Sequence, residues 1–130
     1  MYGNPLNAYQ KTAKNTMSGR ELEAHALTSA AMRLKEFQTK WDPATESGYS
    51  ELACAIQQNQ KLWSIFQAEL STDDHPLPAR LREQLLSVSL FVDKQSFDVL
   101  AHPSPEKIKS LVDINLAIAA GLRGAPAMAA

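Results

Sequence analysis

The spacing of apolar residues in segment 49–70 constrains the fold more than any other feature of the sequence. Apolar side chains, with one amide among them, recur at alternating steps of three and four residues, which places them on one face of an α-helix. This face comprises Tyr49, Leu52, Ile56, Asn59, Trp63, Phe66 and Leu70. Leu62 and Ile65 widen it. Segment 47–70 is therefore predicted to be an amphipathic helix that packs against other helices.

Two further helices are predicted from their capping residues. The first spans 18–41, where Ser18 and Glu21 form a capping box, and Pro43 ends it. The last spans 105–122, with Ser104 as its N-cap and Pro105 at its first position. Their predicted apolar faces are Leu27, Ala30, Leu34, Phe37 and Trp41 in the first and Ile108, Leu111, Val112, Asn115, Ile118, Ala119 and Leu122 in the last.

The remaining predicted helix spans 79–97. It follows a break in the pattern, where Asp73 or Asp74 could act as a cap and Pro78 suits the first helical position. Its middle, LLSVSLFV, alternates apolar and small polar residues as a strand would. We favour the helix because PARLREQLL leads into it with strong helix formers. The apolar face is expected to include Leu81, Leu85, Val88 and Val92.

Four amphipathic helices joined by short connections predict an all-α fold, a compact bundle. The expected organisation is an N-terminal arm (1–17), a helical bundle domain (18–123) and a flexible C-terminal tail (124–130). With 45% apolar and 21% charged residues, the 130-residue chain has the composition of a globular domain rather than a disordered one.

Charge and cysteine content exclude several classes of protein. The net charge of -1 provides no field that would attract nucleic acid or an anionic membrane. A single cysteine, Cys54, forbids an internal disulfide and favours a reducing compartment. The sequence has no signal-peptide pattern and no apolar run of the roughly 20 residues that span a bilayer. A cytoplasmic location is expected.

The chemistry-bearing residues do not form a catalytic or metal-binding pattern. His25, His75 and His102 are far apart, and Asp73, Asp74 and His75 are best explained as a cap and turn. Cys54 is expected to be a packed thiol rather than a nucleophile. We expect neither enzyme activity nor a cofactor, metal or small-molecule substrate.

Two features favour a binding module. Asn59 and Asn115 interrupt apolar faces, and buried amides need hydrogen-bond partners. They either bond to one another or to a loop inside the bundle, which is the favoured interpretation, or they orient a partner. The apolar surface of helices 47–70 and 79–97 is also wider than two narrow helix–helix contacts require, so it could form a groove for an amphipathic helix. The expected partner-binding residues are Asn59, Leu62, Trp63, Phe66, Phe91 and Asn115. A homodimer closed through the 49–70 face is an alternative.

Direct RNA binding has weaker support. Lys11, Lys14 and Arg20 form a thin basic cluster that could contact phosphates, but a solvated arm explains them more simply.

The segments NQKLWSIFQAELSTDDHPLPARLREQLLSVSLFV and LVDINLAIAAGL resemble the FlaF family of flagellar biosynthesis regulators of alphaproteobacteria. The matching residues are Asn59, Leu62 and Trp63; Asp73, Asp74, Leu77 and Pro78; and Ile114, Asn115, Ile118, Gly121 and Leu122. The resemblance covers about residues 1–122, with His75 where the family pattern has Asn.

The resemblance implies a regulator of flagellin production that the filament requires. It implies two partners: flagellin, and the regulator FlbT, which restrains translation of flagellin mRNA. One implied function is a flagellin-binding, chaperone-like adaptor that promotes flagellin synthesis and secretion. The other is a translational regulator working through FlbT or directly on flagellin mRNA.

Overall fold

The computed structural model describes residues 19–40, 46–72 and 77–124, and these ranges contain four α-helices and no strand. The helices are α2 (Gly19–Lys40), α3 (Glu46–Leu70), α4 (Ala79–Ala101) and α5 (Pro105–Leu122). The predicted all-α bundle is therefore confirmed. The arm 1–17, Ser18, Trp41, Pro43, Asp73, Asp74 and His75 lie outside the described residues.

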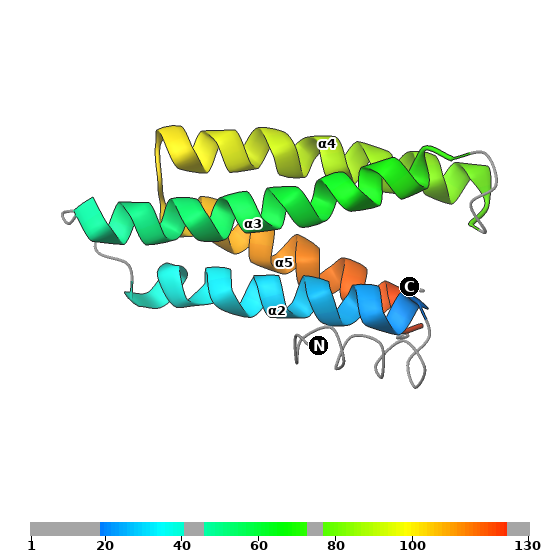
Figure 1. Cartoon of the computed structure of the whole chain (residues 1–130), viewed down its shortest axis with the longest axis horizontal. Helices are drawn as coiled ribbons and strands as arrows, with labels where there is room; N and C mark the ends of the chain where they lie inside the picture. The colour runs from blue at the N-terminus through cyan, green and yellow to red at the C-terminus, as the bar shows by residue number, and fades with distance from the viewer. Residues whose placement is uncertain (1–18, 41–45, 73–76, 125–130) are drawn as a thin grey trace, which may run out of the picture.

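Consecutive helices run in opposite directions, so the bundle has up-down-up-down topology (Figure 1). Each helix packs against its neighbours in the chain, and α5 returns to pack extensively along α2. Within the described ranges α2 makes no backbone contact with α4, which places these two helices on a diagonal. The N-terminal ends of α2 and α4 and the C-terminal ends of α3 and α5 therefore meet at one end of the bundle.

Within the described residues the predicted helix boundaries agree with the structure to within one residue, except in α4. Ser104 caps α5 by accepting a hydrogen bond from the Lys107 backbone nitrogen at 3.3 Å, as predicted. Helix α4 runs to Ala101, beyond the predicted end at 97, and its LLSVSLFV segment is helical rather than extended. Pro78 is the N-cap of α4 and not its first helical residue.

One buried face from each helix forms the core. The buried apolar residues are Ala24, Leu27, Ala31 and Leu34 in α2, Leu52, Ala55, Ile56, Trp63 and Leu70 in α3, Val92 and Val99 in α4, and Ile108, Leu111, Val112 and Ala119 in α5. Most of these positions follow from the predicted periodicity. Helix α4 contributes few large side chains, and it buries Ser89 and Ser96. Their hydroxyls donate to backbone carbonyls three and four residues earlier, which satisfies them.

Five sequence predictions about packing are wrong, one of them for Ile65, which is 51% exposed and does not widen the buried face of α3. The buried face of α2 is centred on Ala24 and Ala31, so Ala30 lies at its edge and is only half-buried. Tyr49 and Leu81 lie near helix ends and are each 40% exposed. Cys54 is exposed rather than packed, because it lies two residues, or about 200° around the helix, from buried Ile56.

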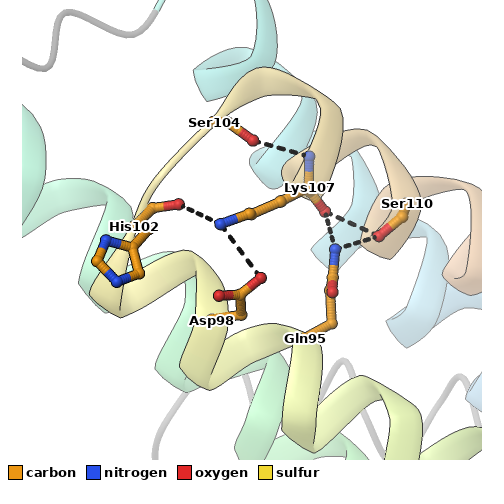
Figure 2. A network of polar contacts seen from close by, with 6 residues as sticks. All are labelled: Gln95, Asp98, His102, Ser104, Lys107 and Ser110. Carbon is orange, nitrogen blue, oxygen red and sulfur yellow. Dashed lines mark hydrogen bonds and ion pairs between the residues drawn. The ribbon is translucent and has the colours of Figure 1, made fainter.

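The turn between α4 and α5 is closed by a polar network (Figure 2). The Lys107 ammonium contacts the Asp98 carboxylate at 3.1 Å and donates to the His102 carbonyl at 2.8 Å. Gln95 donates to the Ser110 hydroxyl at 3.0 Å. These contacts hold the far end of the bundle, opposite the end where α3 and α4 are joined. None of the described helices is both long enough and apolar enough to cross a membrane.

Candidate partner-binding site

A cluster of two amides and an indole lies at the centre of the bundle; we call Asn59, Trp63 and Asn115 the amide–indole cluster. Asn115 of α5 donates to the Asn59 side-chain oxygen at 2.7 Å and to the Leu27 carbonyl at 3.2 Å. Its own oxygen accepts from Trp63 Nε1 at 3.0 Å. Asn115 thus joins α2, α3 and α5, and the internal pairing of the two amides is confirmed.

All three side chains of this cluster are shielded from solvent. Asn59 and Asn115 are 0% exposed and Trp63 is 1% exposed. The Asn59 Nδ2 group is buried without a hydrogen-bond partner in the structure. An unpaired buried donor costs about 1–3 kcal/mol, so the cluster retains one unsatisfied group. Direct partner contact by these residues stays a prediction, and in this conformation they shape the site from beneath.

Above the cluster, the Trp63 ring forms part of the wall of a pocket at the end where α3 and α4 are joined. Phe66 packs edge-on against Trp63, with ring centroids 5.7 Å apart and an interplanar angle of 89°. Side chains from all four helices and from the α3–α4 connection line the pocket. They are Glu23, Leu27, Trp63, Phe66, Glu69, Leu70, Leu77, Leu85, Ile118 and Leu122.

The pocket is small and apolar. Its volume is about 40 Å³, whereas small-molecule sites typically occupy roughly 300–1,000 Å³. A cofactor does not fit this space, but the end of one apolar side chain does. Phe66, Leu85 and Leu122 are only half-buried, so a side chain from outside can gain apolar contacts by entering.

Two carboxyl groups, from Glu23 of α2 and Glu69 of α3, provide the charge of this pocket. Burial, which is the largest cause, a side-chain hydrogen bond with Glu69 and the charge of Glu69 together raise the pKa of Glu23 to about 7. The charge of Arg20 acts in the opposite sense and lowers the pKa. Glu23 is therefore partly protonated near neutral pH, because burial and the adjacent Glu69 carboxylate disfavour its ionised form.

The predicted partner-binding residues separate into four groups. Trp63 and Phe66 line the pocket, and Asn59 and Asn115 lie in the core beneath it. Leu62 is half-buried against the core. Phe91 is 47% exposed and does not line the pocket, because it lies six residues, or about 120° around the helix, from Leu85. The structure therefore does not bring Phe91 together with Trp63 and Phe66.

Sequence reasoning did not identify Glu23 and Glu69. Each is adjacent in the chain to a buried residue, Ala24 or Leu70, and this adjacency is the signal that the sequence offered. Among the described residues no group of three or more histidine, cysteine or acidic side chains is placed to hold a metal ion.

The family model described as "Flagellar protein FlaF" matches residues 5–122. No curated protein and no solved structure matches the chain.

Proposed function

The chain belongs to the FlaF family of flagellar proteins, and on that premise we propose that it is a flagellin-binding, chaperone-like adaptor. In this role it covers an amphipathic terminal helix of newly made flagellin in the cytoplasm, before export, and so promotes flagellin synthesis and secretion. The observation that carries the proposal is the apolar pocket at the end where α3 and α4 are joined.

The form of the pocket supports a helix as its occupant. Its apolar lining comes from four helices, so it is a concave site in a preformed scaffold rather than a flat surface. An apolar side chain on a partner helix would enter it while flanking residues rest on half-buried Phe66 and Leu85. Each Å² of apolar surface removed from water contributes about 25 cal/mol before ordering costs.

Titration calorimetry of the full chain against its cognate flagellin tests the proposal. We expect binding with a negative heat-capacity change, the mark of apolar burial. Absence of binding would overturn the adaptor role and leave FlbT or flagellin mRNA as the physical partner. Of the basic residues behind the RNA alternative, Arg20 lies among the described residues and Lys11 and Lys14 lie outside them, so this alternative stays a prediction.

A matched pair of substitutions in α4 locates the binding surface. Leu85→Gln changes a half-buried side chain in the pocket wall, whereas Leu90→Gln changes one that is 66% exposed outside it. We expect Leu85→Gln to weaken flagellin binding by about tenfold or more, the effect of losing one apolar anchor, and Leu90→Gln to leave it unchanged. The reverse pattern would move the site to the outer face of α4. Circular dichroism confirms that both variants are folded.

A further inference from the structure

An acidic pair lies in the wall of an otherwise apolar pocket, and this combination restricts what the pocket can bind. Glu23 is half-buried and hydrogen-bonded to Glu69, although glutamate side chains are usually ionised and solvated. A purely apolar occupant would cover the two carboxyl groups and remove more of their hydration. The wall thus disfavours such an occupant and favours one that brings a positive charge.

We propose that the acidic pair selects the partner: the segment that fills the pocket is an amphipathic helix with a lysine or arginine one turn from its apolar anchor. The apolar side chain enters among Trp63, Phe66 and Leu85, and the cation lies between Glu23 and Glu69. Residues three or four positions apart lie on the same side of a helix, which matches the adjacency of apolar wall and carboxyl groups. This proposal rests on the proposed adaptor function, and it specifies the chemistry of the segment that the pocket accepts.

Charge complementarity favours this basic occupant over a segment that is acidic or neutral. The charged groups that face Glu23 are Glu69 from α3 and Arg20 from its own helix. The pocket residues contributed by α4 and α5 are apolar: Leu85, Ile118 and Leu122. Arg123, at the end of α5, donates to the Thr28 hydroxyl instead. The partner can therefore supply the cation that the described residues of the lining lack.

Binding of the cation is coupled to release of the Glu23 proton. In the free protein the Glu23 carboxyl group is about half protonated at pH 7 and mostly protonated below it. A bound ammonium or guanidinium stabilises the Glu23 carboxylate, so the proton leaves to the buffer. Because Glu23 has a pKa of about 7 and the cation lowers it, affinity rises as pH increases through neutrality.

The test is calorimetric titration of the full chain with cognate flagellin at pH 6 and pH 8. For the wild type we expect affinity about tenfold higher at pH 8, which is the change for one group with a pKa near 7 that must lose its proton. Glu23→Gln keeps the size and a neutral hydrogen-bonding group but cannot release a proton, so its affinity should vary less than about twofold. Glu36→Gln, an exposed change on the same helix, is the matched control and should behave as wild type.

Two further readouts separate this inference from the adaptor role. Titrations at pH 7 in buffers of different ionisation enthalpy should report release of about half a proton per complex for wild type and none for Glu23→Gln. Single Lys→Gln or Arg→Gln changes in the flagellin terminal helices should identify one that abolishes the pH dependence. Flagellin binding that is independent of pH in the wild type would overturn the inference and leave the adaptor role standing. Absence of binding at both pH values would overturn both.

Discussion

The amide–indole cluster and the pocket are neighbouring regions that share Trp63, yet their polar groups are arranged in opposite ways. In the cluster, the Trp63 indole and the two amides satisfy one another in a sealed interior, apart from one Asn59 nitrogen. In the pocket, two groups of like charge face an apolar surface that opens to solvent. The first arrangement fixes the packing of α2, α3 and α5. The second is unfavourable in the free protein, and the cation of the proposed partner would relieve it.

The largest effect is expected in the cluster. Asn115→Ala removes the partners of the Trp63 indole, the Asn59 oxygen and the Leu27 carbonyl in one change. We expect the free energy of unfolding to fall by about 3 kcal/mol, measured by urea denaturation. Asp113→Ala, an exposed change on the same helix, should lower it by no more than about 0.5 kcal/mol. A loss below about 1 kcal/mol for Asn115→Ala would mean that the cluster does not hold the three helices together.

A smaller effect is expected where the two regions meet. Phe66→Ala removes a half-buried ring that packs edge-on against Trp63. We expect a loss of about 2 kcal/mol in unfolding free energy, less than for a fully buried phenylalanine, together with flagellin binding about tenfold weaker. Phe97→Ala is the control, since Phe97 is 64% exposed on α4. If Phe97→Ala weakened binding and Phe66→Ala did not, the outer face of α4 would replace the pocket as the binding surface.

The next prediction concerns the charge of the pocket in the free protein. Because the pKa of Glu23 is raised to about 7 from 4.5, the folded state binds a proton that the unfolded state releases between these values. Stability is therefore highest below pH 4.5 as far as this group is concerned, and falls as pH rises toward 7. After allowance for solvent screening of this half-exposed group, the free energy of unfolding falls by about 1 kcal/mol over this pH range.

Glu23→Gln checks the sign of this effect. At pH 8 the variant should be more stable than wild type by about 1 kcal/mol, or a few degrees in Tm, and the difference should disappear near pH 5. Thermal melts at both pH values measure it. A variant that is less stable at pH 8 would show that the Glu23 carboxylate is favourably paired, and the contrast between pocket and cluster would be lost.

The smallest effect is expected at the opposite end of the bundle. Lys107 pairs with Asp98 in a network that is exposed but contains opposite charges (Figure 2). Lys107→Met should lower the unfolding free energy by about 0.5 kcal/mol, and less at high salt, since exposed pairs contribute little. Lys109→Met, which removes the more exposed pair with Asp113, should have a still smaller effect in the same denaturation experiment. A loss above about 2 kcal/mol for Lys107→Met would show that this end of the bundle also contributes substantially to the free energy of unfolding.

Much of the fold could be predicted from local pattern. Helical periodicity located α2, α3 and α5, and the Ser104 cap located the start of α5 within one residue. Helix α4 was the least certain because alternating serines imitate a strand, and its end was placed four residues early. The pairing of Asn59 with Asn115 was foreseen because buried amides need partners.

The candidate site was predictable only in part. Trp63 and Phe66 stood out as aromatic residues on one helical face, and both line the pocket. Phe91 was grouped with them by residue type, although its position around α4 turns it away from Leu85. Glu69 carried no sign that it would meet a glutamate from another helix, since periodicity describes one helix at a time.

The sequence by itself determined which segments form helices, which face of each is apolar and to which family the chain belongs. These properties depend on side-chain spacing along one segment and on motifs that are continuous in the chain. The tertiary structure alone decided that Glu23 meets Glu69 beside an apolar pocket, where its pKa is raised, and that Phe91 lies outside this pocket. The physical reason is that the rotation and offset of one helix against another arise from how the whole core packs, and charges acquire shifted pKa values only at the positions where that packing brings them together.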